Sequence, residues 1–474
     1  MKAEYRNATV IGSGPNGLAA AVELARHGLN VEVLESQSTF GGGARSAELT
    51  LPGFLHDVCS AVHPLASASP FFRGLDLSTH GLEWIQPPVP LAHPLDDGTA
   101  VLLHRSIAET SENLDRADAR SYRDLMTPFV DNWEGLTADL LGPIRFPSKP
   151  LSAARFGFYG LRTAKGFAHS RFRGKRIRAL FAGLAAHSLL PLDRWGTTSF
   201  GIVLSMLGHA LGWPIAKGGS QKIVNALRSY LSSLGGSLEL NSRVDSLDGR
   251  LGPGRVVLCD LTPRGLLRIA RNILPARFCR KLERFRMGNA VFKIDWALSE
   301  PIPWNAPECR LAGTVHVGGS IEEIVEAEAL PELGKHPERP FIRLSQPTLF
   351  DPQRAPDGKH IAWAYCHVPL GSTVDLTTRI EDQIERFARG FKDCIIAKKV
   401  SPPAELERNN ANLVGGSISG GSNDLSQLFL RPTARLYSTP LRNLFLCSSS
   451  TPPGGGVHGM CGFHAAQAAL TEGG

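Results

Sequence analysis

Three glycines near the N-terminus are spaced to bind a phosphate-bearing ligand. Gly12, Gly14 and Gly17 form a GxGxxG pattern within "ATVIGSGPNGLAAAVELARHGLNVEVLES" (8–36). The first glycine permits a tight turn, the second lets backbone N–H groups approach a pyrophosphate, and the third lets a helix pack closely on a strand. Glu35 follows 23 positions after Gly12, where a carboxylate can bind both ribose hydroxyls and would repel a 2′-phosphate. The spacing predicts a dinucleotide site and argues against NADP.

A second glycine cluster, "FGGGARS" (40–46), follows the ribose carboxylate directly. Arg45 can pair with phosphate, and the preceding small residues let the backbone approach it. NAD-dependent dehydrogenases do not need this second clamp, and no second strand-linked GxGxxG marks a nicotinamide domain. The pattern therefore favours non-covalently bound FAD. The expected contacts in these two loops also include the neighbours Pro15, Asn16, Ser36, Gly42, Gly43 and Ala44.

The loops require strands and helices to hold them. We expect a strand at 8–11, a small-residue helix ending at Gly28, and a second strand ending at Glu35. Later, "GGSQKIVNALRSYLSSLGGSLELNSRVDSL" (218–247) has the pattern of a glycine turn, an amphipathic helix and a strand. The stretch "RVVLCDLTP" (255–263) predicts a further strand that ends near the cofactor.

The glycine loop, Glu35 and "GGARS" together resemble the phytoene desaturase and flavin amine oxidase superfamily of FAD enzymes. The stretch "LTLPGFLHDVCSAVHPLA" (49–66) is more specifically similar to the phytoene dehydrogenase branch, and to bacterial relatives of pyridine nucleotide-disulfide oxidoreductase domain-containing protein 2. The resemblance covers nearly the whole chain. It implies an α/β fold, with a doubly wound Rossmann-type FAD-binding domain of the glutathione reductase and amine oxidase type, and an inserted α+β substrate domain.

The family pattern divides the chain into five segments. The FAD-binding domain is expected to combine residues 1–75, 214–280 and 430–474, with the substrate domain formed by residues 76–213 and 281–429. In this arrangement the resemblance places Val244 beside the adenine.

The C-terminal stretch "NLFLCSSSTPPGGGVHGMCGFHAAQAAL" (443–470) resembles the last motif of the phytoene desaturases. Its glycines would let the backbone pass under a flat ring, and the N–H groups of the following helix would stabilise negative charge on reduced flavin. His458 stands where many relatives have proline, and it either hydrogen-bonds or titrates with the flavin or is a packing residue at a helix start. The cofactor contacts expected here are Ser448, Gly455, Gly456, Val457, His458 and Met460.

One further residue is a catalytic candidate by resemblance. "MGNAVFKIDWALSEPIPW" (287–304) has the alternation of a strand and resembles the amine oxidase strand whose lysine holds a water beside the flavin. Lys293 occupies the matching position and could stabilise developing negative charge. The alternative is an exposed lysine on an amphipathic strand.

The substrate domain has less recognisable chemistry. The segment 171–213 predicts two helices over the flavin, and His187, Trp195, His209 and Trp213 are candidates to line a pocket. The resemblance implies a hydrophobic organic substrate that loses a hydride to flavin N5, with oxygen or a quinone reoxidising the flavin. Two alternatives stay open: an isomerase or saturase that works through reduced FAD, and a non-catalytic protein that holds FAD for partner binding.

Composition narrows the class further. The 474 residues are 42% hydrophobic and 20% charged, the first residues lack the pattern of a secretory signal, and no segment is apolar enough to span a bilayer, so a cytoplasmic protein is expected. Eight scattered cysteines without metal-type spacing predict buried thiols and no metal site.

Positive charge is concentrated in one part of the chain. Residues 140–192 carry ten Lys or Arg and no acid, although the net charge is only +7. Within it, the run 155–178 contains five aromatic residues, so it predicts either a solvated cationic face or peripheral contact with an anionic membrane. No motif indicates nucleic-acid binding, and the oligomeric state is left open.

Overall fold

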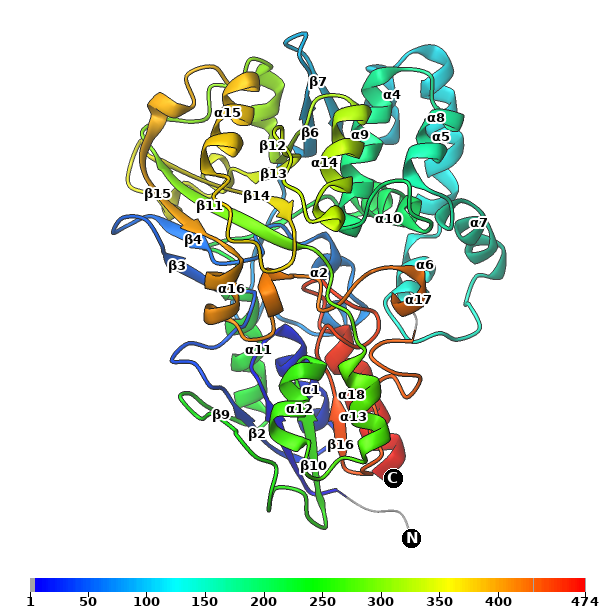
Figure 1. The fold of residues 1–474 in the computed structure, drawn as a ribbon, viewed down its shortest axis with the longest axis vertical. Coiled ribbons are helices and arrows are strands. Elements are labelled where there is room, and N and C mark those ends of the chain that lie inside the picture. Colours follow the sequence, from blue (N-terminus) through cyan, green and yellow to red (C-terminus); the bar gives the residue numbers. More distant parts are fainter. Residues whose placement is uncertain (1–4, 429, 474) are drawn as a thin grey trace.

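The computed structural model describes residues 5–428 and 430–473. Figure 1 shows a lower part built on one sheet and a broader upper part, in which a second sheet lies beside a group of helices. The two chain ends described in the structure both lie in the lower part, close to each other.

The lower sheet is parallel, and its five strands come from three separated stretches of the chain. Their order is β16-β10-β1-β2-β9, and every neighbouring pair is parallel. The strands are β1 (Asn7–Ile11), β2 (Asn30–Leu34), β9 (Ser237–Glu239), β10 (Arg255–Cys259) and β16 (Leu444–Leu446). Such an order brings the carboxyl ends of β1, β2 and β10 to one edge, where ligands of open parallel sheets bind.

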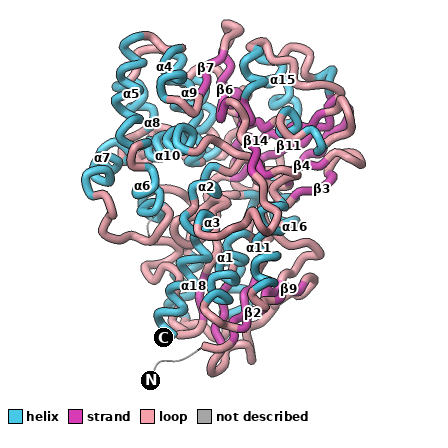
Figure 2. Tube along the Cα trace, turned by 180° about the vertical axis from the view of Figure 1, so that it is seen from behind, coloured by secondary structure: helices cyan, strands magenta, loops and turns pink. Residues whose placement is uncertain are grey.

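Helices cover both faces of this sheet. Val10, Val33 and Leu258 point to the face covered by α1 (Pro15–Arg26), α11 (Gln221–Ser233) and α18 (Met460–Gly473), which is seen in Figure 2. Alternate residues such as Ile11 and Val257 point to the opposite face, under α12 (Pro263–Ala270) and α13 (Ala276–Glu283). The doubly wound, Rossmann-type fold expected from the sequence is confirmed.

The last helix packs unusually close to the first. A Cβ atom at Gly462 in α18 would lie 1.8 Å from the carbonyl oxygen of Asn16 in α1, so only glycine allows this contact. The apolar C-terminus is thereby built into the core of the dinucleotide domain.

The upper sheet has seven strands in the order β15-β11-β14-β13-β12-β6-β7. Its strands are β6 (Val89–Pro94), β7 (Ala100–Leu103), β11 (Ala290–Leu298), β12 (Ala312–Val317), β13 (Ile342–Ser345), β14 (His360–Val368) and β15 (Ile395–Ser401). Only the pair β12–β6 is parallel. One face packs Ile294, Leu344 and Ala364 into an apolar core with α15 (Thr377–Phe387).

The opposite face of this sheet carries two rows of polar and aromatic side chains. Strand pairing aligns Thr314, Ser345, Trp363 and Asp295 in one row, and His316, Arg343, Tyr365 and Lys293 in the next. Because side chains alternate along a strand, these residues share the face that looks toward the dinucleotide domain.

Helices form the rest of the upper part. Beside the sheet lie α4 (Ile107–Glu112), α5 (Arg116–Val130), α6 (Trp133–Leu140), α7 (Pro150–Gly160), α8 (Ala164–Arg171), α9 (Lys175–Ala185), α10 (Thr197–Ala210) and α14 (Ile321–Ala329). The remaining elements are α2 (Pro64–Ala68), α3 (Pro70–Arg73), α16 (Pro403–Asn409), α17 (Leu425–Leu428), β3 (Ser46–Glu48), β4 (Leu55–Asp57), β5 (Trp84–Ile85) and β8 (Ile215–Ala216).

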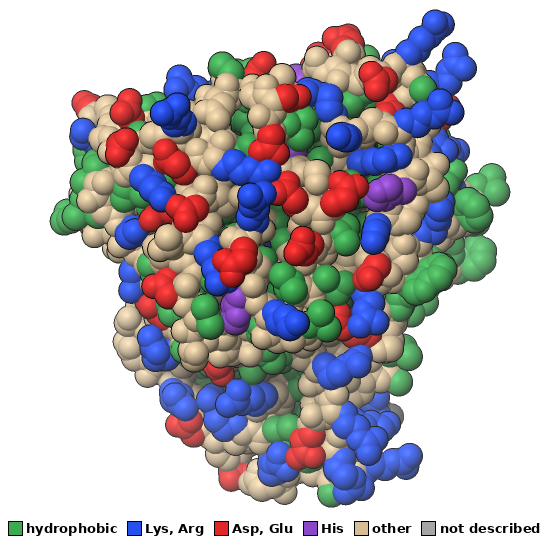
Figure 3. All heavy atoms as spheres, turned by 45° about the horizontal axis from the view of Figure 1, so that its top comes forward, with side chains coloured by type: hydrophobic (Ala, Val, Ile, Leu, Met, Phe, Trp, Pro, Cys, Tyr) green, Lys and Arg blue, Asp and Glu red, His purple; other side chains and the backbone are tan. Residues whose placement is uncertain are grey.

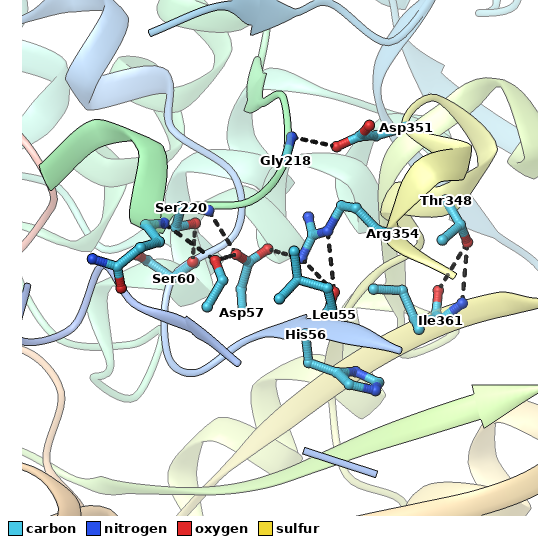
Figure 4. A network of polar contacts seen from close by, with 12 residues as sticks. Leu55, His56, Asp57, Ser60, Gly218, Ser220, Thr348, Asp351, Arg354 and Ile361 are labelled. Carbon is cyan, nitrogen blue, oxygen red and sulfur yellow. Dashed lines mark hydrogen bonds and ion pairs between the residues drawn. The ribbon is translucent and has the colours of Figure 1, made fainter. Parts of the chain in front are cut away.

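A buried polar network joins the two parts (Figure 4). The Asp57 carboxylate at the end of β4 accepts hydrogen bonds from Arg354 at 2.8 Å and from the Ser220 backbone N–H at 2.7 Å. Arg354 also donates to the Leu55 carbonyl, and Ser220 Oγ donates to the Ser60 carbonyl. Burial alone would raise the pKa of Asp57, but Arg354 and these hydrogen bonds outweigh it and hold that pKa below its usual value.

Candidate cofactor and substrate site

A single cavity of about 400 Å³ connects the glycine loop with the polar face of the upper sheet. At one end it is lined by Gly12, Gly14 and Glu35, and at the other by His187 and Trp213. The cavity is therefore built between the two parts of the molecule, as is common for cofactor sites.

The glycine loop has the conformation that its pattern requires. Gly12 has a φ of +100°, which side-chain-bearing residues rarely adopt. A Cβ at Gly17 would lie 2.1 Å from the Gly12 carbonyl oxygen, so the third glycine is needed for the turn to close against α1. Pro15 and Asn16, the first residues of α1, also line the cavity. Phosphates bound here would face the positive end of a helix.

Glu35 is fixed at the carboxyl end of β2. Its Oε2 accepts hydrogen bonds from the Ser13 backbone N–H at 3.0 Å and from Ser13 Oγ at 2.5 Å, while Oε1 accepts from the Gln37 N–H at 3.0 Å. Glu35 and Ser36 both line the cavity. A carboxylate held in this way is oriented for ribose hydroxyls.

The second glycine cluster stacks directly on the first. A Cβ at Gly42 would lie 3.0 Å from the Cα of Gly14, and Gly42 and Gly43 both line the cavity, while Ala44 is buried beneath them. The Arg45 guanidinium also lines it, held by the carbonyls of Gly42 and Asn409 and by Thr39 Oγ1, at 2.9 to 3.1 Å. Its position agrees with a cation that faces phosphate.

A carboxylic acid that carries no sequence motif lies at the centre of this end. Asp260 follows β10 and lines the cavity, and its Oδ2 accepts a hydrogen bond from the Gly17 N–H at 3.1 Å. Burial raises its pKa to about 7, and the nearby Glu35 carboxylate adds to the rise. The only signal in the sequence is its position after a strand expected to end near the cofactor.

The middle wall of the cavity is formed by residues 59–65. This segment follows Asp57 directly, so the network of Figure 4 fixes its backbone. Within it, His63 Nε2 lies 2.8 Å from Ser220 Oγ, and burial lowers the His63 pKa to about 4, so this imidazole is neutral. The resemblance marks this stretch as a family feature but assigns no contact to it.

The C-terminal motif contributes a narrower set of contacts than expected. Gly456 and Val457 line the cavity. Ser449 lines it in place of Ser448, whose hydroxyl donates to the Leu261 carbonyl at 2.7 Å. The other expected contacts lie behind the wall: Gly455 against Ser419, Met460 buried at the start of α18, and Val244 in the apolar core below the sheet.

His458 lies behind the cavity wall and caps α18. Its Nδ1 accepts a hydrogen bond from the Met460 backbone N–H at 3.0 Å, and its carbonyl accepts from Ser69 Oγ at 2.6 Å. Burial lowers its pKa to about 4, so the ring is neutral at physiological pH. The geometry matches the packing alternative expected from the sequence.

Lys293 is separated from the cavity by an aromatic ring. It is buried on β11, forms an ion pair with Asp295, and its Nζ lies 5.5 Å from the centre of the Trp363 ring, which lines the cavity. Burial raises the pKa of Asp295 to about 6, although the Lys293 charge opposes the rise. Lys293 can therefore act on the cavity only through Trp363.

Two of the four expected pocket residues line the cavity. His187 and Trp213 meet edge to face, with ring centres 6.0 Å apart, and His187 Nε2 lies 3.0 Å from His316 Nε2. Burial lowers the pKa of both histidines well below the usual value, so the pair is neutral. The other two lie elsewhere: His209 bonds to Tyr122 at 2.8 Å in the helical core, and Trp195 is 67% exposed.

The sheet supplies lining residues that no sequence pattern indicated. Trp363 and Tyr365 stack in parallel, 5.6 Å apart, and Arg343 lies beside them with its guanidinium 3.4 Å from Glu328. Thr314 and Ser345 complete this wall. These residues come from three strands, so only the strand register brings them together.

The cavity fits FAD. Two stacked glycine clusters and an oriented carboxylate suit a dinucleotide, and the cavity continues past them to the glycines at 454–456 and the ring-lined wall, where a flat ring can lie.

Comparisons with known proteins agree with this geometry. Residues 10–75 match a family described as an NAD(P)-binding Rossmann-like domain. Pyridine nucleotide-disulfide oxidoreductase domain-containing protein 2 of Mus musculus is 26% identical, with 100% of this chain and 94% of that protein covered. Phytoene desaturase (neurosporene-forming) of Cereibacter sphaeroides is 24% identical (96% and 92% covered), and a component of the limonene dehydrogenase of Castellaniella defragrans 23% (97% and 93%).

Solved structures share the fold over the full length. An oxidoreductase from Methanosarcina mazei aligns with a TM-score of 0.67 at 16% identity, covering 97% of this chain and 99% of that one. Putrescine oxidase bound to putrescine aligns with a TM-score of 0.62 at 15% identity, with 98% of each chain covered. The protein is thus an FAD-binding oxidoreductase, related in sequence to the phytoene desaturases over its whole length and folded as the flavin amine oxidases are.

Proposed function

We propose that the protein is an FAD-dependent dehydrogenase or desaturase that removes hydrogen from a hydrophobic organic substrate. The observation that carries the proposal is the continuity of the cavity between the dinucleotide loops and the wall at His187 and Trp213. The names of the relatives, limonene dehydrogenase and phytoene desaturase, support a hydrophobic substrate class.

When bound, FAD supplies the acceptor for a hydride from a substrate C–H bond, and oxygen or a quinone accepts the electrons afterwards. The chain supplies the positions. Gly12, Gly14 and the start of α1 bind the phosphates, and Glu35 orients the ribose. The wall at 59–65 and the residues Gly456 and Val457 confine the ring end of the cavity.

The substrate end excludes charge more than it supplies it. Leu204, Trp213 and Leu344 give it apolar surface, and His187 and His316 are neutral because burial lowers their pKa values. A neutral histidine pair can position a substrate by hydrogen bonding without attracting water as a charged group would. This environment suits an apolar substrate that carries at most a small polar group.

The two alternatives make different predictions about the same cavity. An isomerase or saturase would use it with reduced FAD and cause no net oxidation. A protein that only holds FAD would not need His187 and Trp213 to share a cavity with the dinucleotide loops, so the continuity supports catalysis over that alternative.

The test is an anaerobic visible spectrum of the FAD-loaded protein, mixed in turn with terpenes, polyenes, unsaturated acids and amines. Loss of the oxidised flavin bands with one class supports dehydrogenation and identifies the class. Bands that disappear only with dithionite would contradict it. Substrate rearrangement that needs dithionite would then indicate the isomerase, and no reaction with any class the non-catalytic role.

A further inference from the structure

Helix α7 turns an apolar face to the outside of the molecule. Leu151, Ala154, Phe158 and Leu161 follow one another at intervals of three and four residues and are all exposed, Leu151 by 89% and Phe158 by 72%. Such spacing places them along one side of a helix. The opposite side is the one that packs, because Phe156 and Tyr159 meet the ring of Phe129 in α5 edge to face.

Neighbouring segments extend this face. Ile144 and Phe146, in the loop before α7, are 66% and 84% exposed. Trp195 adjoins the other end, because its neighbour Gly196 donates a backbone hydrogen bond to the Leu161 carbonyl at 2.9 Å. Figure 3 shows hydrophobic side chains projecting from the edge of the molecule where α7 lies in Figure 1. We name Ile144, Phe146, Leu151, Ala154, Phe158, Leu161 and Trp195 the α7 face.

This position differs from the one expected from the sequence. The aromatic residues of the run 155–178 are mostly part of the core: Phe167 and Phe172 are fully buried, and only Phe158 is well exposed. The exposed apolar surface instead begins before the run, at Ile144.

Positive charge surrounds the α7 face. Lys149 and Lys165 are exposed, and Arg162 lies at the end of α7. Of the ten cations at 140–192, Arg145 alone forms an ion pair within the described part of the chain, with Asp139 at 3.7 Å. An apolar ridge with unneutralised cations beside it fits a surface that is apolar within and anionic outside, which describes a lipid bilayer with acidic headgroups.

A second copy of the chain fits this surface less well. A two-fold contact through the α7 face would place the same cations opposite one another, without acids to neutralise them. The face is also a projecting ridge without a matching groove in Figure 3. Among the described residues, no helix is both long and apolar enough to cross a membrane, so the contact would be peripheral.

We propose that the α7 face docks the protein on an anionic membrane surface, with Leu151, Phe158 and Phe146 inserted among the lipids and the surrounding Lys and Arg against the headgroups. This goes beyond the oxidoreductase function and does not depend on it, because membrane docking and flavin chemistry can fail separately.

The test is sedimentation of the FAD-loaded protein with vesicles of phosphatidylcholine alone and of phosphatidylcholine mixed with phosphatidylglycerol. Preferential binding to the anionic vesicles is expected, weakened by salt. The double substitution Leu151→Glu with Phe158→Glu should lower the partition coefficient by at least about tenfold. Leu311→Glu is the matched control, because Leu311 is also exposed (47%) but lies in the segment Pro307–Leu311, away from α7.

An intact flavin spectrum and an unchanged melting temperature would show that each variant is folded. Wild-type protein that binds neither kind of vesicle would overturn the proposal, as would unchanged binding by the double variant. A concentration-dependent dimer in analytical ultracentrifugation, abolished by the double variant and accompanied by no vesicle binding, would show that the face instead pairs two copies.

Discussion

The two ends of the cavity are built in different ways. At the dinucleotide end, the groups that define the site are backbone atoms of Gly12, Gly14 and Gly42, together with the carboxylate of Glu35. At the substrate end, they are the side chains of Trp213, Arg343 and Tyr365, which are far apart in the sequence and meet through packing.

The comparison explains why the two ends tolerate change differently. A backbone cradle fails when any side chain fills it, because the close contacts leave no room for adjustment. A wall of side chains can be altered one residue at a time, since the cavity changes its shape but the strands behind it remain. Substitutions at the first end should therefore abolish FAD binding, and those at the second should alter which substrate is accepted.

The largest effect is expected at the glycine loop. Gly17→Val should lower FAD affinity by at least about a hundredfold, because its Cβ would lie 2.1 Å from the Gly12 carbonyl oxygen and displace the loop from the phosphates. Flavin absorbance after gel filtration measures it. Gly157→Ala is the control, since a Cβ at Gly157 meets no atom within 4 Å. A Gly17→Val protein that retains its yellow colour would contradict the account of this end.

The junction between the two ends should respond next. Arg354→Met leaves Asp57 buried without its charged partner and should lower the free energy of unfolding by about 3–5 kcal/mol. The double substitution Asp57→Leu with Arg354→Met should be less destabilising, because neither charge is then left unpaired. Urea titrations of the three proteins check this order. Equal losses in the single and double variants would show that the pair does not act as a unit.

The same pair predicts the direction of acid sensitivity. The folded protein holds the pKa of Asp57 below its usual value, so the pair contributes its stability above that usual value and loses it as the pH falls through the depressed one. Arg354→Met should remove this part of the acid sensitivity. Parallel acid titrations of both variants and the wild type, followed by fluorescence, measure it.

At the substrate end the effect should be moderate and confined to catalysis. Trp213→Ala enlarges the cavity beside His187 and should lower kcat/KM roughly tenfold while leaving FAD affinity unchanged. Trp195→Ala is the matched control, because the exposed Trp195 does not line the cavity. Loss of flavin from the Trp213 variant would mean that the two ends are not independent.

The smallest effect concerns Asp260, the one carboxylic acid among the glycine loop N–H groups. With a pKa raised to about 7, Asp260 is protonated below that pH and ionised above it, where its charge would repel a pyrophosphate. FAD affinity should fall severalfold as the pH rises through about 7. Asp260→Asn should bind FAD equally well across that range. Fluorescence quenching of free FAD gives both curves, and parallel curves would contradict the role of Asp260.

Prediction from the sequence succeeded where chemistry is local. The pattern from Gly12 to Glu35 lies within one strand, turn and helix, so its geometry follows from residue order. By contrast, Trp195 and His209 are candidates by residue type alone, and which helical side faces the cavity depends on packing with α5 and on the exposed turn before α10. Arg343 and Tyr365 carry no motif, because the register of β13 and β14 alone aligns them.

The fold itself was predicted further than the site. Helices at 175–185 and 197–210 occur where two were expected, and the strand at 290–298 contains Lys293 as expected. However, alternation along that strand suggested one exposed face, whereas all nine residues are buried, because the polar face of the sheet is covered by the dinucleotide part. A sequence pattern shows that two faces differ, but not that both are covered.

The most direct test of the central claim is a crystal structure of the protein with FAD, because the account requires one cavity to hold the cofactor and to reach the substrate wall. We expect continuous density from Glu35, past Gly14 and Arg45, with the flavin ring between residues 59–65 and Gly456–Val457 and open toward His187 and Trp213. Density that leaves the cavity before Val457, or a ring that faces solvent with His187 and Trp213 closed off behind the wall, would contradict it.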